Sequence, residues 1–266
     1  MRSETAVNLK PFYAGANRKL SVALKLIALP LLIIGGVLIA LNQSLNAQAI
    51  FFSSGFILFM IGWGIGFFSS EKASDKALVK FLKLNGFKAI KTLSEDSVPP
   101  SIWEKSAIFK FSYCFSGKLD GYDFVGANIT GKYMHWVAPR TAVLGGPMLR
   151  IKLNHSWPRI DFTRPGNLFL QFAKSSRVAE KDMTKVSLEG DFSDKFSVEV
   201  HKGNELEAEE LFTPNFMAKI EDFGKFADFT VVGNQLFIMT SGSYYDKRNL
   251  NTLFGSASLL IAQLEK

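Results

Sequence analysis

Two long apolar runs decide how this chain is organised: LSVALKLIALPLLIIGGVLIAL at residues 20–41 and AIFFSSGFILFMIGWGIGFF at residues 49–68. Each run is about twenty residues long, the length that an α-helix needs to cross ~30 Å of hydrocarbon. Lys25 is the only charged residue in either run, and its long side chain can reach the interface. The connecting residues 42–48 carry no charge. The sequence therefore predicts a transmembrane helical hairpin over residues 20–68.

Basic residues stand on both outer flanks of the predicted hairpin. Residues 1–19 hold four basic side chains and one acidic side chain, and residues 71–91 hold six lysines against two acidic residues. Because lysine and arginine are enriched on the cytoplasmic side of membrane helices, both termini are predicted to be cytoplasmic at the inner membrane. An alternative interpretation makes the first run a signal peptide that is cleaved near Ala47-Gln48-Ala49. The second run then anchors the chain with its C-terminal part on the same side.

The formal net charge of +7 belongs to these flanks, since residues 92–266 hold 20 basic and 21 acidic residues. A near-neutral C-terminal part argues against nucleic acid as a partner. Anionic lipid headgroups are the partner that the basic flanks favour. The single cysteine, Cys114, excludes an internal disulfide and a cysteine-rich metal site, and its aromatic surroundings predict a buried thiol.

The segment after the second run is predicted to continue as an amphipathic helix over residues 71–85. Lys72, Lys76, Lys80 and Lys83 recur at spacings of four, four and three, which places them on one helical stripe. We predict that these lysines contact lipid phosphates; the alternative is a stalk helix whose lysines only set the topology.

Two glycines mark a second predicted feature of the hairpin. Gly62 and Gly66 form a small-xxx-small pair, which predicts close helix packing within the hairpin or between protomers. The alternative is the general enrichment of glycine in membrane helices.

Residues 99–266 are predicted to form an α+β domain, after a basic tail at 1–19, the hairpin at 20–68 and a juxtamembrane helix and linker at 69–98. Short aromatic and β-branched patterns predict strands, with a hairpin turn at Asp120-Gly121, another at Gly233-Asn234 and a turn at 145–147. Helices are predicted at 204–212, at 214–223 and over the amphipathic segment 250–264. The predicted strands are Ala107–Phe115, Tyr122–Ile129, Lys132–Val137, Leu149–Asn154, Leu168–Phe172, Lys185–Leu188, Phe196–Val200 and, on either side of Gly233-Asn234, Phe226–Val232 and Gln235–Thr240.

The stretch 185–240 carries a run of residues that resembles a known family. It has the order Phe192…Phe196-x-Val198…Thr213-Pro214-x-Phe216-Met217. This order is similar to that of bacterial two-span membrane proteins with a conserved C-terminal domain of unknown function. The resemblance implies a helical hairpin and a β-rich cytoplasmic region, and it implies no catalytic residue. The run also has a structural interpretation, because Thr213 before Pro214 is a typical helix start.

No motif in the chain predicts catalysis, a cofactor or a metal. His135 and His155 lie in similar Trp-Pro-Arg settings but lack a carboxylate at metal-ligand spacing, and His201 stands alone. The glutamates at 205, 207, 209 and 210 are typical of a solvated helix face. We therefore predict a non-enzymatic scaffold or interaction module with a protein partner or self-association. The alternative is a membrane-surface enzyme or a small-ligand receptor with a pocket in the α+β domain.

Overall fold

The computed structural model describes residues 7, 26–27, 29–34, 37, 53–54, 56–57, 59–60, 77–94, 97, 108–133, 142–164, 182–240 and 247–266. The chain divides into two compact units, residues 10–81 and residues 1–9 with 82–266, and each is described by itself. In the first unit, the described residues of 26–37 and 53–60 are helical. Among the described residues, no helix is both long and apolar enough to cross a membrane.

Several predictions fall outside the described residues. Gly62 and Gly66 lie there, as do Lys72 and Lys76, His135 and the strand at Leu168–Phe172. Most of the predicted hairpin lies there as well, so the hairpin and the domain boundaries stay predictions. Within the predicted juxtamembrane segment, residues 77–84 are helical, with Lys80 and Lys83 exposed and Leu78, Phe81 and Leu82 buried.

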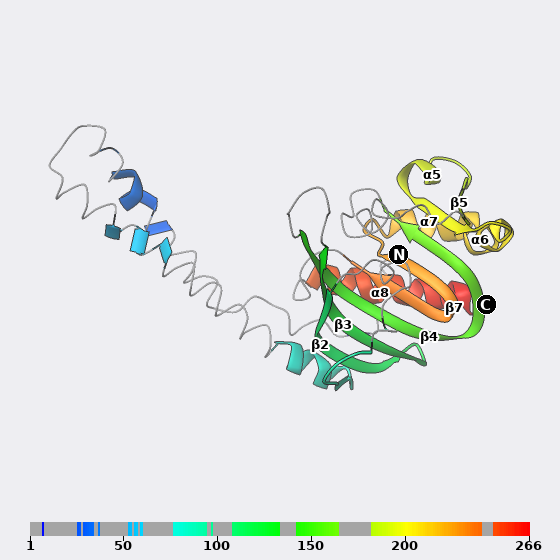
Figure 1. Ribbon diagram of the computed structural model, residues 1–266, viewed down its shortest axis with the longest axis horizontal. Helices are drawn as coiled ribbons and strands as arrows, with labels where there is room; N and C mark the ends of the chain where they lie inside the picture. The colour runs from blue at the N-terminus through cyan, green and yellow to red at the C-terminus, as the bar shows by residue number, and fades with distance from the viewer. Residues whose placement is uncertain are drawn as a thin grey trace. The chain divides into compact units, whose positions relative to one another are not determined.

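The unit formed by residues 1–9 and 82–266 is α+β, as predicted. In its described residues an antiparallel sheet has the order β1-β2-β3-β4-β6-β5, and β7 pairs with β4 off this path (Figure 1). The strands are β1 (Lys88–Ala89), β2 (Ile108–Leu119), β3 (Tyr122–Tyr133), β4 (Ala142–Thr163), β5 (Met183–Val186), β6 (Ser197–His201) and β7 (Asp228–Met239). The helices are α5 (Phe192–Lys195), α6 (Glu205–Leu211), α7 (Pro214–Asp222) and α8 (Lys247–Leu264).

The central strand β4 is 22 residues long and joins two halves of the sheet. Residues 142–151 pair with β3, residues 160–163 pair with β6, and β7 follows β4 from Met148 to Phe162. The β4–β7 register shifts on both sides of Trp157, which lies opposite Gly233. Irregularities of this kind bend a sheet. Figure 1 shows β4 curving strongly along its length.

Two predicted turns are wrong for the same reason. Gly233-Asn234 is no hairpin, because β7 runs through it, and the positive φ of 56° at Gly233 lies at the bend against Trp157. Residues 145–147 are likewise inside β4, opposite residues 128–130 of β3. Pro147 donates no backbone hydrogen bond, but its carbonyl accepts one from the Thr240 N–H at 3.1 Å. Pairing with long neighbouring strands overrides the local turn preference at both places.

Other local predictions are confirmed. Asp120 and Gly121 both have positive φ, 50° and 90°, at the tight turn between β2 and β3. Thr213 caps α7, since its side-chain oxygen accepts from the Phe216 N–H, and Pro214 occupies the first turn. The apolar positions of α8 are buried as its spacing predicts: Leu250, Leu253, Phe254, Ala257, Leu260, Ile261 and Leu264.

The strand predictions located most of the strands but not their lengths, and none of them fell on β1. The predicted segments 107–115, 122–129, 185–188 and 196–200 overlap β2, β3, β5 and β6, and 149–154 is only the middle of β4. Of the strand predicted at 132–137, residues 132 and 133 are the end of β3, and residues 134–137 lie outside the described residues.

Aromatic rings fill the two halves of the core. In one half Phe87, Phe115 and Phe124 pack together, and Phe87 and Phe124 contact Phe254 of α8. In the other half Phe162 of β4 lies at the centre of a cluster. Its ring centroid is 5.0–6.3 Å from those of Phe192, Phe196, Phe212, Phe226 and Phe229.

The opposite face of the β4–β7 pair is polar and is also buried. Arg159 and Asp161 form an ion pair with an Nη2–Oδ2 distance of 3.2 Å, and the Thr230 hydroxyl donates to Asp161 Oδ1 at 2.6 Å. Further along, the buried Asp228 carboxylate accepts from the Arg164 backbone N–H at 2.8 Å. Because alternate residues of a strand point to opposite faces, β4 is buried on both sides here.

Hydrogen bonds connect the C-terminal residues Leu264 and Glu265 to the bend in β4. The Glu265 carboxylate accepts hydrogen bonds from the backbone N–H groups of Asn154 (3.0 Å) and His155 (3.3 Å) and from the Tyr122 hydroxyl (3.1 Å). The Trp157 indole N–H donates to the Leu264 carbonyl at 3.2 Å. Desolvation, and then the neighbouring Glu265 carboxylate, raise the pKa of Tyr122. Asn154 and His155 lie where the β4–β7 register shifts, so their backbone N–H groups are not paired with β7. The Glu265 carboxylate accepts hydrogen bonds from these groups instead.

Replacing Glu265 with alanine is expected to lower the free energy of unfolding by about 2 kcal/mol, the usual cost of hydrogen bonds lost from a charged acceptor. The measurement is urea unfolding of the full chain in detergent, followed by tryptophan fluorescence. Glu265→Gln keeps one carbonyl acceptor and should lose less. An alanine variant as stable as the parent chain would show that the contact does not hold the bend.

Candidate functional site

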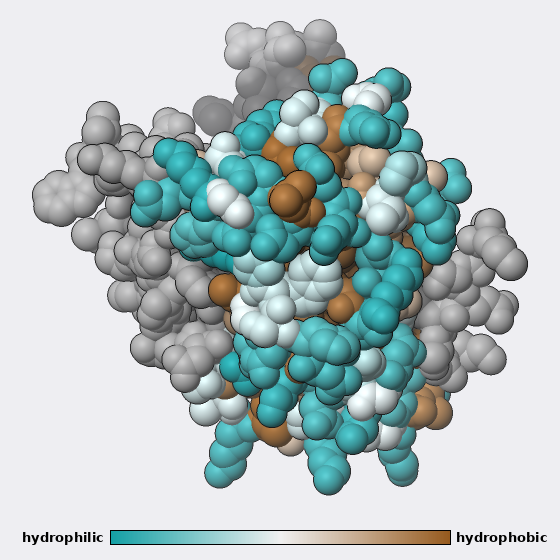
Figure 2. All heavy atoms as spheres, turned by 90° about the vertical axis from the view of Figure 1, so that its right-hand side faces the viewer, coloured by the Kyte–Doolittle hydropathy of each residue, from teal (hydrophilic) through white to brown (hydrophobic). Residues whose placement is uncertain are grey.

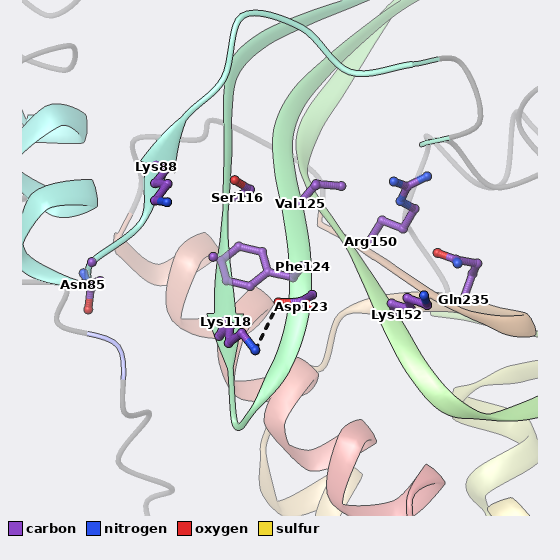
Figure 3. Close-up of a pocket in the computed structure, with 12 residues that line it drawn as sticks. Asn85, Lys88, Ser116, Lys118, Asp123, Phe124, Val125, Arg150, Lys152 and Gln235 are labelled. Carbon is purple, nitrogen blue, oxygen red and sulfur yellow. Dashed lines mark ion pairs between the residues drawn. The ribbon is translucent and has the colours of Figure 1, made fainter.

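An open groove crosses the outer face of the first half of the sheet. It has a volume of about 620 Å³ and is lined by residues from the turn after the helix at 77–84 and from β1, β2, β3, β4 and β7 (Figure 3). We call it the basic groove. Its lining includes Asn85, Lys88, Ser116, Lys118, Asp123, Phe124, Val125, Arg150, Lys152 and Gln235.

The strand register explains why these side chains meet. Lys88 lies opposite Ser116, Ser116 opposite Val125, and Val125 opposite Arg150, so the four form one row across the sheet. In the next row on the same face, Lys118 lies opposite Asp123, and Lys152 lies opposite Gln235. Short side chains at 116 and 125 form the floor, and long basic side chains stand on either side, as Figure 3 shows.

The groove is positively charged. It is lined by three lysines and one arginine, against the single carboxylate of Asp123. The Lys118 Nζ–Asp123 Oδ1 distance is 3.6 Å, but both side chains are about 70% exposed (70% and 72%), so solvent weakens this pair. Lys88 and Lys152 are exposed, and Arg150 is half-buried. An anion in the groove would meet cations from both sides.

The ionisable side chains of the lining are mainly cationic. Its residues include no histidine and no cysteine, and Asp123 is its only carboxylate. Elsewhere in the described residues, no group of three or more His, Cys, Asp or Glu residues is placed to hold a metal ion.

The predicted candidate residues lie elsewhere in the chain. His155 is 66% exposed, with its Nδ1 3.4 Å from Glu265 Oε2, and His201 is half-buried at the end of β6. Burial raises the pKa of the Cys114 thiol, which agrees with the buried position expected for it. The exposed Lys80 and Lys83 precede the groove in sequence but do not line it.

The groove itself was missed at the sequence level, although one signal points to it. Arg150-x-Lys152 and Ser116-x-Lys118 each place two polar residues at a spacing of two, which is one face of a strand. This pattern alone does not identify a groove, because no sequence signal places β1 beside β2 or Arg150 beside Val125.

The opposite end of the same unit is acidic. Residues 182–226, which form β5, α5, β6, α6 and α7, hold eleven acidic and five basic residues. The Lys195 ammonium lies 2.7 Å from Glu221 Oε1 and 3.7 Å from Asp191 Oδ2, and the hydrogen bond to Glu221 raises the pKa of Lys195. The face around α6 and β5 is mostly hydrophilic, with only scattered hydrophobic residues (Figure 2). In the described residues of this unit, the groove end is therefore positively charged and the end formed by residues 182–226 is negatively charged.

Fold and groove together define an α+β protein with an open, positively charged groove on a bent antiparallel sheet. No protein-family model matches the chain, and no curated protein matches it in sequence. The chain is similar to the crystal structure of the mycobacterial trehalose monomycolate transport factor A, TtfA, with 10% sequence identity and a TM-score of 0.47. The likeness covers 70% of this chain and 92% of that one.

Proposed function

We propose that the chain is a membrane-anchored, non-enzymatic interaction module at the cytoplasmic face of the inner membrane. Residues 20–68 form the two-helix anchor with both termini inside, and the α+β unit binds its partner beside the membrane. Gly62 and Gly66 pack the two helices, and Lys72, Lys76, Lys80 and Lys83 contact the headgroups. Self-association through the hairpin or a separate protein partner completes the module.

Exposed apolar side chains in the first unit carry this proposal. Ten large apolar side chains of the described helical residues 26–60 are 40–65% exposed. In the described residues from 82 onward, only Leu84 and Leu206 are large, apolar and exposed. A water-soluble protein rarely leaves so many apolar side chains together in water, whereas a bilayer covers them.

Anchoring and topology can be tested on one set of single-cysteine variants. In a Cys114→Ser background, the sites are Ser3→Cys in the tail, Ser44→Cys between the runs and Lys202→Cys in an exposed loop of the α+β unit. A membrane-impermeant maleimide should label only Ser44→Cys in intact cells, and all three after permeabilisation. Alkaline carbonate should leave the chain in the membrane. Labelling of Lys202→Cys from outside, or extraction by carbonate, contradicts the proposal.

The basic groove also favours a second candidate, a small-ligand receptor at the membrane surface. Affinity isolation in mild detergent separates the two candidates. Recovery of a stoichiometric protein partner or of a homo-oligomer supports the interaction module. Recovery of the monomer with a bound small molecule supports the receptor.

A further inference from the structure

The position of the basic groove in the sequence places it within reach of the membrane. Asn85 and Gly86 line the groove, and only residues 69–84 separate them from the end of the second apolar run. Sixteen residues span at most about 55 Å when fully extended and about 24 Å as a helix. A bilayer with its headgroups is ~40–45 Å thick. The groove is therefore tethered within roughly one membrane thickness of the lipid surface.

Charge gives the unit a preferred orientation toward such a surface. The groove end carries the lysines and the arginine described above, and residues 182–226 carry the acidic excess at the other end of the same unit (Figure 1). An anionic leaflet attracts the first end and repels the second. Both forces turn the groove toward the lipid.

The shape of the groove fits a phosphate carried on a surface better than an enclosed small molecule. β1 and β4 are three strand spacings apart, which is about 14 Å. The side chains of Lys88 and Arg150 can therefore contact the same bound group from opposite sides, over Ser116 and Val125. The guanidinium of an arginine and the ammonium of a lysine are the usual donors to phosphate oxygens. A site for a free ligand typically encloses most of the ligand's surface, whereas this groove is open and is lined by four cationic side chains.

We propose that the basic groove binds the phosphate groups of anionic lipids in the leaflet that anchors the chain, an inference that rests on the anchoring proposed above. Lys88, Arg150 and Lys152 hold the phosphate, and Ser116 provides a hydroxyl at the floor. When a lipid phosphate occupies the groove, the face of the sheet formed by β1, β2, β3 and the first part of β4 contacts the headgroups. The acidic end with α5–α7 then stays in the solvent, where a protein partner can reach it.

The test uses the full chain in lipid nanodiscs, with Cys114→Ser and a fluorophore on Asn234→Cys beside the groove. Discs of phosphatidylcholine alone are compared with discs that also contain phosphatidylglycerol, each with the same small fraction of a headgroup-attached quencher. Quenching is expected to increase with phosphatidylglycerol. Lys88→Gln/Arg150→Gln/Lys152→Gln should weaken this association about a hundredfold, since each cation near an anionic surface contributes about fivefold.

The matched control removes the same charge from the same unit. Lys185→Gln/Lys202→Gln/Lys219→Gln changes three exposed lysines of the acidic end and should leave the quenching at the parental value or raise it. Lys88→Arg/Lys152→Arg keeps the charge of the groove and should keep the quenching. Equal quenching in the groove variant and the parent chain overturns the proposal, as does equal loss in the control.

Glycerol phosphate identifies the source of the phosphate. If millimolar glycerol phosphate changes the fluorescence in phosphatidylcholine discs, and phosphatidylglycerol has no effect, the site takes a soluble phosphate ester, and the lipid proposal is overturned. If glycerol phosphate only competes weakly with phosphatidylglycerol, the lipid is the ligand. Failure of the anchoring itself is seen separately, because the chain then elutes apart from the discs.

Discussion

Replacing Asp161 with alanine is expected to lower the free energy of unfolding by about 3–5 kcal/mol. The Asp161 carboxylate pairs with Arg159 and accepts from Thr230, and the two charged side chains are only 6% (Arg159) and 3% (Asp161) exposed. The variant leaves the guanidinium buried without this carboxylate, and the desolvation cost of the cation remains. Urea unfolding of the full chain in detergent, followed by tryptophan fluorescence, measures the loss.

The exposed pair of the basic groove provides the matched control for Asp161. Asp123→Ala removes a carboxylate that faces Lys118 in solvent, and exposed pairs contribute about 0–1 kcal/mol. A double variant, Arg159→Met/Asp161→Leu, removes both charges and should recover part of the stability lost in Asp161→Ala. If Asp161→Ala and Asp123→Ala cost the same, the buried pair has no special role in stability.

What could be predicted from the sequence was local. Asp120-Gly121 determines its own turn, Thr213-Pro214 its own helix start, and the spacing of α8 its buried face. Each of these signals acts over a few residues, so no knowledge of a distant partner is needed.

What could not be predicted depends on pairing between distant segments. Gly233-Asn234 would form a turn in an isolated peptide, but here both flanking segments pair with β4 and the chain continues as one strand. The contact of Glu265 with the bend spans more than a hundred residues of sequence. The basic groove has the same origin, because Lys88 and Arg150 meet only through the registers of β1, β2 and β3.

Replacing Phe162 with alanine is expected to cost about 3–5 kcal/mol in the free energy of unfolding, by creating a cavity at the centre of the second aromatic cluster. The ring is fully buried and stacks on Phe229 at 5.0 Å and on Phe196 at 5.2 Å. Phe162→Leu keeps much of the volume and should cost less. The same urea titration measures both variants.

Phe223, which lies next to this cluster, provides the control. It is half-buried, and its ring contacts Phe226 at 5.8 Å, so Phe223→Ala should cost clearly less than Phe162→Ala. Phe162 and Asp161 are neighbours on β4 but face opposite sides of the sheet, and the two variants therefore remove different interactions, apolar packing and a buried ion pair. If both sides of β4 are independent, the losses of Phe162→Ala and Asp161→Ala should add in the double variant. A double variant that loses much less than the sum would show that one substitution already unfolds the half of the sheet on which the other depends.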